Sequence, residues 1–146
     1  MSGSRKDDPY AGYRFIVEIH GMTAGGFTDV SGLGVETEIE TRREGGVNDY
    51  EYKLPARSKY TDIILRRGAA DADLLWNWHQ DVVRGKFERK NGSIYLLNES
   101  GENALWWDFF EAYPVKWEGP SLNALSSAVA VETLTLTHQG LSRVKA

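Results

Sequence analysis

The sequence contains no cysteine, and its 146 residues include only four prolines and three histidines. The absence of cysteine excludes disulfide bonds, thiolate catalysis and cysteine-ligated metals. No two of the histidines have the i, i+4 spacing of a helical metal site. We therefore expect no metal and no cofactor, and ordinary surface or core positions for His20, His79 and His138.

The sequence also lacks signals for membranes, export and nucleic acids. No apolar run approaches the roughly 20 residues that span a bilayer, and the polar N-terminus has no apolar signal-peptide segment. The net charge is −4. Its basic residues are interleaved with acids, whereas nucleic-acid-binding proteins usually carry a basic stripe. We therefore expect synthesis and assembly in the cytoplasm, no membrane insertion and no specific nucleic-acid binding.

Catalytic patterns are equally sparse. Glu36, Glu38 and Glu40 align on one strand face, which is typical of a solvated surface, whereas general acid–base catalysis needs carboxylates in different environments. The glycine-rich segment 25–34 lacks the lysine followed by serine or threonine of a phosphate-binding loop, and no serine lies in a nucleophile elbow. The five tryptophans favour core and interface packing over a platform for sugars or bases. The sequence therefore predicts that the protein is not an enzyme.

The residues that are present indicate one β-rich domain. Hydrophobic residues make up 41% of the chain and charged residues 26%, which is typical of a folded protein. We expect a flexible arm at 1–11 and a single domain at 12–146. Alternating patterns and turn signals predict about seven strands, including 13–21, 35–44, 60–68, 94–98, 104–112 with a continuation at 115–117, and 126–141.

One helix is predicted at about 71–84, because apolar residues recur there at helical spacing and Gly85 suits a helix C-cap. The Asn91-Gly92 pair is read as a turn that opens the next strand. Seven strands and one helix favour an antiparallel sandwich or barrel with the helix packed on it.

The strand at 35–44 is the most regular in the sequence. Val35, Thr37, Ile39 and Thr41 share one face, and Glu36, Glu38, Glu40 and Arg42 share the other. The segment 45–59 that follows has two glycines and no strong period. Together with 60–68 it predicts a long extruded hairpin, at about 40–62, such as interaction proteins use to pair with a neighbour.

Five segments, in order and spanning about residues 8 to 141, resemble phage tail tube proteins, and above all the inner-tube subunits of phage-tail-like contractile injection systems. The segments are DPYAGYRFIVEIHG, GFTDVSGLGVETEIETRREGG, KLPARSKYTDIILRRG, LWNWHQDVVRGKFERKNGSIYLL and AYPVKWEGPSLNALSSAVAVETLTLTHQGL. The most specific pieces are VSGL, EGG, LPAR and PVKWEGPSLNA. Ala56 stands where the family often has glycine.

The resemblance implies two packed antiparallel sheets that form a barrel-like sandwich with one flanking helix. It further implies hexameric rings that stack into a hollow, rigid inner tube, which a contractile sheath propels through a target envelope. The implied partners are other copies of the chain, a sheath protein, baseplate or spike and tube-terminator proteins, and cargo in the lumen. The implied final location is a phage tail or injection particle.

The resemblance also suggests roles for particular residues. Contacts between subunits or rings are expected from the excursion, at Gly45, Gly46, Asn48, Asp49, Tyr50, Tyr52, Leu54 and Arg57. The lumen wall is expected at Glu36, Glu38, Glu40 and Arg42, with the sheath-facing exterior as the competing position for that face. Two alternative functions stay open: a type VI secretion-like ring protein that carries effectors, and a β-sandwich module that binds carbohydrate or another ligand.

Overall fold

The structure is a computed structural model that describes residues 15–43, 51–68, 74–86, 88–120, 124–125 and 131–145. The predicted arm at 1–11 lies outside these residues. The described part contains one helix, α2 (Leu74–Val83). Its ten strands are β1 (Phe15–Ile19), β2 (Met22–Phe27), β3 (Asp29–Ser31), β4 (Val35–Arg43), β5 (Glu51–Tyr60), β6 (Ile63–Gly68), β7 (Lys90–Leu97), β8 (Asn103–Glu118), β9 (Val131–Thr137) and β10 (Gly140–Lys145). Among the described residues, no helix is long and apolar enough to cross a membrane.

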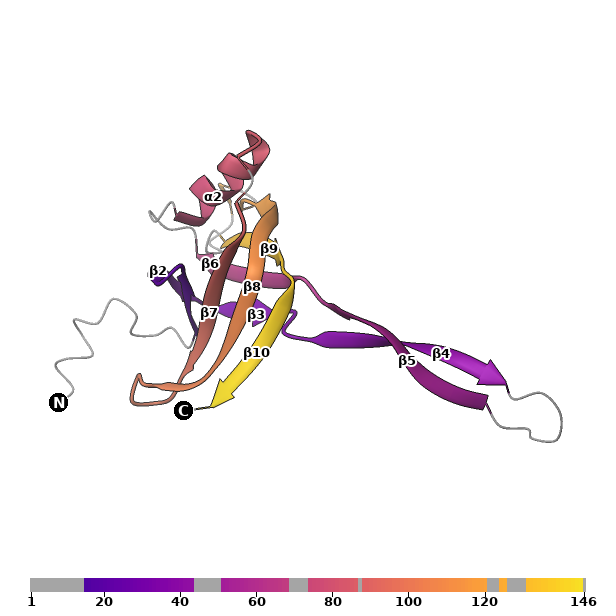
Figure 1. Cartoon of the computed structure of the whole chain (residues 1–146). Helices are drawn as coiled ribbons and strands as arrows, with labels where there is room; N and C mark the ends of the chain where they lie inside the picture. The colour runs from indigo at the N-terminus through magenta and orange to yellow at the C-terminus, as the bar shows by residue number, and fades with distance from the viewer. Residues whose placement is uncertain are drawn as a thin grey trace.

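The main sheet is antiparallel and has eight strands, in the order β2-β1-β7-β8-β9-β6-β3, with β10 paired to β8. The 16-residue strand β8 joins two halves of this sheet, because its first part pairs with β7 and β10 and its last part pairs with β9. Figure 1 shows β7, β8 and β10 crossing in front of β6 and β3. The halves thus face each other in the barrel-like arrangement that the sequence predicts.

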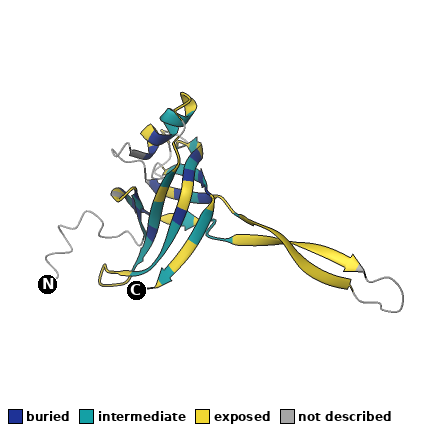
Figure 2. Cartoon of the chain, in the orientation of Figure 1, coloured by how far each residue is buried: buried dark blue, intermediate teal, exposed yellow. Residues whose placement is uncertain are grey.

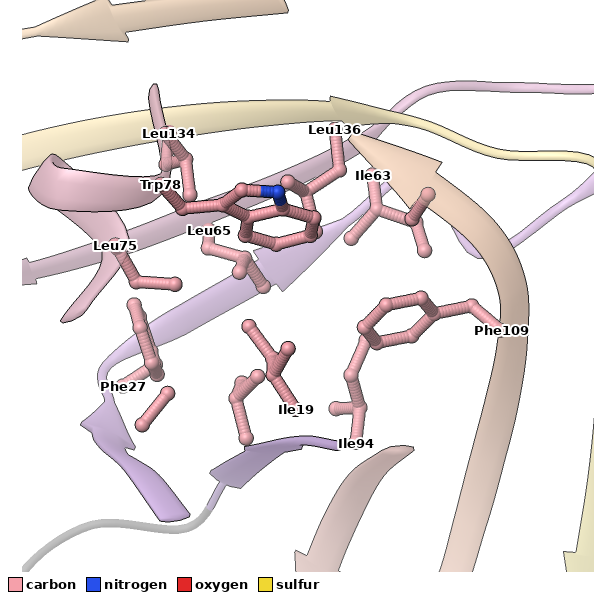
Figure 3. Close-up of a cluster of buried hydrophobic side chains, with 13 residues drawn as sticks. Ile19, Phe27, Ile63, Leu65, Leu75, Trp78, Ile94, Phe109, Leu134 and Leu136 are labelled. Carbon is pink, nitrogen blue, oxygen red and sulfur yellow. The ribbon is translucent and has the colours of Figure 1, made fainter. Parts of the chain in front are cut away.

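The hydrophobic core fills the space between the two halves. Its buried side chains alternate along β1, β6 and β9, as expected for strands with one face turned inward. Figure 3 shows side chains from the sheet and from α2 pointing into one cluster. The buried hydrophobic residues are Val17, Ile19, Ala24, Phe27, Ile63, Leu65, Leu75, Trp78, Ile94, Phe109, Ala112, Leu134 and Leu136.

The predicted helix is confirmed over Leu74–Val83, and its predicted start at 71–73 lies outside the described residues. Its C-terminus is a Schellman motif, in which the Lys86 amide donates to the Asp81 carbonyl (2.7 Å) and the Gly85 amide to the Val82 carbonyl (3.1 Å). Leu75 and Trp78 are one helical turn apart and both are buried. This spacing anchors α2 on the main sheet.

Two expectations about the first part of the sheet are wrong. The strand expected at 60–68 does not return the hairpin, because 51–60 forms β5 and pairs with β4, whereas β6 pairs with β3 and β9. Asn91 and Gly92 lie inside β7 and make no turn. A Cβ atom at Gly92 would lie 2.3 Å from Phe109 Cζ and 2.5 Å from the Glu18 carbonyl oxygen, so glycine here permits close packing.

The C-terminal part also differs from the expected single strand at 126–141. Its described part contains two strands, β9 and β10, which are separated at His138 and Gln139 and pair with different parts of β8. The predicted continuation beyond Pro114 is confirmed, because β8 runs through this proline without a break. A register shift between Pro114 and Lys116 accommodates it, as expected for a residue without an amide proton.

Arg67 ties the two halves of the sheet together. The Arg67 Nε lies 2.6 Å from Glu132 Oε1 on the neighbouring strand β9, and its Nη1 donates to the Ala24 carbonyl of β2 at 2.9 Å. The guanidinium also lies over the Phe27 ring, 4.9 Å from its centroid. Arg67 is 3% exposed, so this charge is held by β2, β6 and β9 together.

We expect Arg67→Ala to lower the free energy of unfolding by about 3–5 kcal/mol, because it leaves the Glu132 carboxylate and the Ala24 carbonyl without this partner. Urea denaturation followed by tryptophan fluorescence measures the change. The matched control is Lys116→Ala, which removes the exposed ion pair between Lys116 and Glu118 (3.0 Å) and should change stability by no more than about 1 kcal/mol. Equal effects of the two variants would contradict the role given to Arg67.

Candidate functional site

The strands β4 and β5 form a separate two-stranded sheet that projects from the body (Figure 1). In the described part of this hairpin, every residue with a described side chain is exposed except Tyr60, and Figure 2 shows both strands as exposed along their length. An isolated two-stranded hairpin is marginally stable in water. A long hairpin without a layer beneath it is therefore the surface of this protein that most clearly needs a partner.

The cross-strand register gives the hairpin an apolar face. Val35 lies opposite Tyr60, Thr37 opposite Ser58, and Ile39 opposite Pro55, and residues that lie opposite each other share a face. Val35 is 59% exposed and Ile39 is 62% exposed. The two hydroxyl groups of the middle pair, Thr37 Oγ1 and Ser58 Oγ, are 2.8 Å apart. We call this surface the apolar face: Val35, Thr37, Ile39, Thr41, Lys53, Pro55, Ser58 and Tyr60.

The opposite surface, the charged face, carries all four residues expected to line a lumen. Glu36 lies opposite Lys59, Glu40 opposite Leu54, and Arg42 opposite Tyr52. Two residues expected at contacts between copies, Tyr52 and Leu54, therefore share this face with the expected lumen residues. We define the charged face as Glu36, Glu38, Glu40, Arg42, Tyr52, Leu54 and Lys59.

The remaining contact candidates fall at the bulge or beyond the described residues. The register shifts between Thr37 and Ile39, so that Ala56 and Arg57 both lie opposite Glu38. The expected contact residue Arg57 thus sits at a β-bulge, a feature that bends and twists a strand. The other five candidates lie outside the described residues: Gly45, Gly46, Asn48, Asp49 and Tyr50.

The hairpin leaves and re-enters the body at one point, where Thr61 joins the two crossings. Thr61 Oγ1 lies 2.9 Å from the Gly32 carbonyl oxygen and 3.2 Å from that of Gly34. The Thr61 amide also donates to the Gly34 carbonyl at 3.2 Å. His138 reaches the same place, with Nε2 2.9 Å from the Thr61 carbonyl oxygen. We call this cluster the hairpin root: Gly32, Gly34, Thr61 and His138.

Sequence reasoning missed the hairpin root. The one local signal is the pair of glycines within residues 31–34, and such glycines are also typical of ordinary turns. Gly32 has φ +83°, and a Cβ atom there would lie 1.8 Å from the Asp62 carbonyl oxygen. The other members, Thr61 and His138, come from distant parts of the chain, so no local sequence pattern predicts their contact.

A second polar surface lies on the outer side of the main sheet, around a hollow of about 200 Å³ lined by Glu18, His20 and Asp108 among others. Ser93 Oγ and Asp108 Oδ1 are 2.6 Å apart, and no hydrogen bond joins the described Ser93 to a histidine. Burial raises the pKa of Tyr95 beside this hollow, the hydrogen bond with Ser93 opposes that rise, and the Glu18 and Asp108 carboxylates add to it. The described residues around this hollow therefore supply no activated nucleophile.

Metal and sugar sites find little support in the described residues. These residues contain no group of three or more acidic, histidine or cysteine side chains that could hold a metal ion. Trp78 is buried, and Trp76 packs edge-on against Trp117 with ring centroids 4.5 Å apart. Such tilted pairs stabilise packing and do not present the open, flat aromatic surface on which a sugar or base stacks.

Comparison with known proteins gives a consistent result. The family described as T4-like virus tail tube protein gp19 matches residues 11–142. No curated protein sequence matches the chain. Among solved structures, a chain of an extracellular contractile injection system, the PVC sheath–tube complex in its extended state, is 29% identical with a TM-score of 0.81, and the match covers 100% of this chain and 98% of that one.

Two further solved structures extend the comparison. A chain of the anti-feeding prophage cap, which terminates the tube, is 29% identical with a TM-score of 0.80, over 92% of this chain and 89% of that one. Hcp1 from Flavobacterium johnsoniae is 18% identical with a TM-score of 0.57, over 92% of this chain and 97% of that one. At that identity the likeness to Hcp1 concerns the fold alone.

We expect Gly32→Ala to destabilise the protein by roughly 2–3 kcal/mol more than Gly101→Ala. Both glycines have nearly the same positive φ, +83° and +81°, so an alanine meets a comparable penalty for left-handed φ at both positions. Only at Gly32 does the added Cβ atom meet the backbone, whereas it meets nothing within 4 Å at Gly101. Thermal and urea unfolding of the two variants measure the difference, and equal losses would show that the crossing at Gly32 is not tightly packed.

Proposed function

The chain belongs to the T4-like virus tail tube protein family, and on that basis we propose that six copies close into a ring and that rings stack into the hollow inner tube of a contractile injection system or phage tail. Its role is structural. The wall of the tube is the functional unit, and a single chain is one building block of that wall.

One observation carries this proposal most directly: within the described part of the chain, no layer covers either side of the β4–β5 hairpin. Val35 and Ile39 on its apolar face are more than half exposed, and burying such side chains is favourable. A neighbouring copy supplies the missing layer. Because the hairpin projects to one side, each copy covers the next in a head-to-tail contact, and such contacts close into rings when the rotation fits.

The distal half of the hairpin supports contacts with two partners at once. Ile39 and Pro55 lie on the apolar face, whereas Leu54 and Tyr52 lie on the charged face. Leu54 is 40% exposed and Tyr52 is 46% exposed. We infer that the apolar face packs on the neighbour within a ring and that Tyr52 and Leu54 contact the adjacent ring.

The proximal half of the charged face is more suited to water. Glu36 and Glu38 lie there, Lys59 lies opposite Glu36, and Arg57 lies at the bulge opposite Glu38. We propose that this half turns toward the lumen, and that Glu40 and Arg42 extend it to the edge of the contact that Leu54 and Tyr52 make with the adjacent ring. Alternating charges of both signs would give cargo a hydrated wall to which no single class of molecule adheres strongly.

The partners follow from the proposed assembly. The similar chains come from a sheath–tube complex and from a tube-terminating cap, and we propose a sheath protein and a terminator as partners of this chain, together with a baseplate or spike protein that nucleates the tube. We further propose that the chain is not an enzyme, that it is assembled in the cytoplasm, and that the finished tube acts within an injection particle.

A type VI secretion-like ring protein is the second candidate, and the fold shared with Hcp1 is the observation that favours it. Both candidates predict rings, so ring formation does not separate them. Binding of the assembled tube to a sheath protein is the result expected of the first candidate, whereas rings that carry effectors in their lumen are the result expected of the second.

We expect the purified chain, imaged by negative-stain electron microscopy and weighed by light scattering, to form six-membered rings or tubes, with a baseplate or seed tube added where nucleation is slow. Ile39→Asp should abolish rings, because it places a charge in the contact between neighbours. Glu36→Gln on the opposite face of the same strand is the matched control and should assemble normally. A wild-type chain that stays monomeric with a seed tube would overturn the proposed assembly.

The variant Tyr52→Asp tests the proposed contact between stacked rings. Tyr52 lies on the other face from Ile39, so this variant should still form rings but should give few or no stacked tubes. Circular dichroism and thermal unfolding check that the chain remains folded. Normal tube lengths would remove Tyr52 from the contact between rings and leave the ring contact untouched.

A further inference from the structure

His138 is a buried histidine whose two ring nitrogens both face carbonyl oxygens. Its Nε2 lies 2.9 Å from the Thr61 oxygen, and its Nδ1 lies 3.0 Å from the Gly140 oxygen. His138 is 9% exposed. Water is therefore largely excluded from the ring, and the two backbone oxygens are its polar partners.

Carbonyl oxygens only accept hydrogen bonds. A neutral imidazole carries one N–H and can donate to only one of them, whereas the doubly protonated imidazolium donates at both nitrogens. In the neutral ring, the lone pair of the other nitrogen would point at a carbonyl oxygen about 3 Å away. The observed arrangement of His138 is thus complete only in the protonated form.

The two carbonyl groups belong to parts of the molecule that the hairpin must connect. Thr61 follows β5 directly and also binds Gly32 and Gly34, so it holds both crossings of the hairpin root. Gly140 begins β10, which pairs with β8 in the main sheet. Figure 1 shows the hairpin leaving the body beside the start of β10. His138 is therefore the member of the hairpin root that joins Thr61 to the main sheet.

The side chains around His138 supply no fixed counter-charge. The titratable groups on the segments packed against it are Tyr60 and Asp62 at the root and Glu111 and Tyr113 on β8. Tyr60 contacts the ring, with centroids 5.5 Å apart, and Asp62 and Glu111 are exposed. Among the described residues, no carboxylate forms an ion pair with His138, so the two carbonyl oxygens are what its protonated form binds.

We propose that His138 is a positioning residue whose protonation clamps the hairpin root to the body. With both nitrogens protonated, the ring holds the Thr61 and Gly140 carbonyls together. Loss of one proton releases one of these hydrogen bonds and loosens the root. The direction follows from the number of N–H donors: the clamp is complete in the protonated form and incomplete in the neutral form, so raising the pH should loosen the root.

This clamp matters for the proposed tube, because the angle at which the hairpin leaves the body decides where it meets the neighbouring copy. That consequence rests on the proposed function, whereas the clamp itself is a property of the single chain. We expect closure of the hexameric ring by the wild-type chain to be favoured when His138 is protonated.

Hydrogen exchange at the root tests the clamp without reference to assembly. In the wild-type chain, protection of the Gly34 and Thr61 amides, corrected for intrinsic exchange, should fall about fivefold between pH 5.5 and 8.0, the factor expected from one hydrogen bond. Protection in the turn between β7 and β8 should not change and serves as the internal reference. His138→Gln should remove the pH dependence, and the control His79→Gln should keep it.

The imidazole of His138 allows a second measurement on the wild-type protein. This measurement tests the clamp even if the His138→Gln variant does not fold. Nitrogen-15 NMR of the imidazole, in solution or on assembled material, should show both His138 nitrogens protonated at pH 5.5, with one proton lost as the root amides lose protection. A neutral ring at pH 5.5, or pH-dependent protection that persists in folded His138→Gln, overturns the clamp. If the clamp is found but no rings form at any pH, the proposed tube function fails alone.

Discussion

The crossing at Thr61 is the constraint on which the arrangement of the molecule depends. The chain leaves the body at residues 32–34 and returns at residues 61–62. The Thr61 side chain on the returning segment contacts the Gly32 and Gly34 carbonyls of the outgoing segment, and so holds the two segments together. The backbones approach so closely that a side chain at Gly32 would collide with the Asp62 carbonyl. Arg67 joins the two halves of the body through contacts that do not involve the hairpin. The hairpin is therefore attached at one end to a body that is held together by its own contacts.

Local patterns predicted the elements that bury one face. β1 and α2 could be recognised because their inward residues recur with the period of a strand and of a helix, and the same holds for Leu134 and Leu136 in β9. β5 was missed for the corresponding reason: every residue from Glu51 to Lys59 is exposed, so no burial imposed an alternating pattern on it. Gly92 misled because a glycine required for close packing against Phe109 resembles a turn residue in the sequence.

The candidate site was predicted in part, and its limits are equally physical. The two faces of β4 were correctly separated from the sequence, because side chains alternate along any strand whether or not a core is present. Which residues of the returning strand join each face depends on the register and on the bulge at Ala56 and Arg57. The hairpin root could not be found at all, since its contact between Thr61 and His138 joins residues 77 positions apart.

In the single chain, the hairpin differs from the rest of the molecule in how its side chains are buried. The body contains a buried hydrophobic core and pairs its buried charge, although single apolar residues such as Val83 are exposed on it. In the described part of the hairpin no side chain is buried, and Val35, Ile39, Leu54 and Tyr52 are exposed on a separate two-stranded sheet. Places where local rules fail in an otherwise consistent structure are expected to be functional. A closed assembly covers such surfaces and removes the edges. These observations support our proposal that the exposed hairpin is half of an interface, whose other half is the next copy of the same chain.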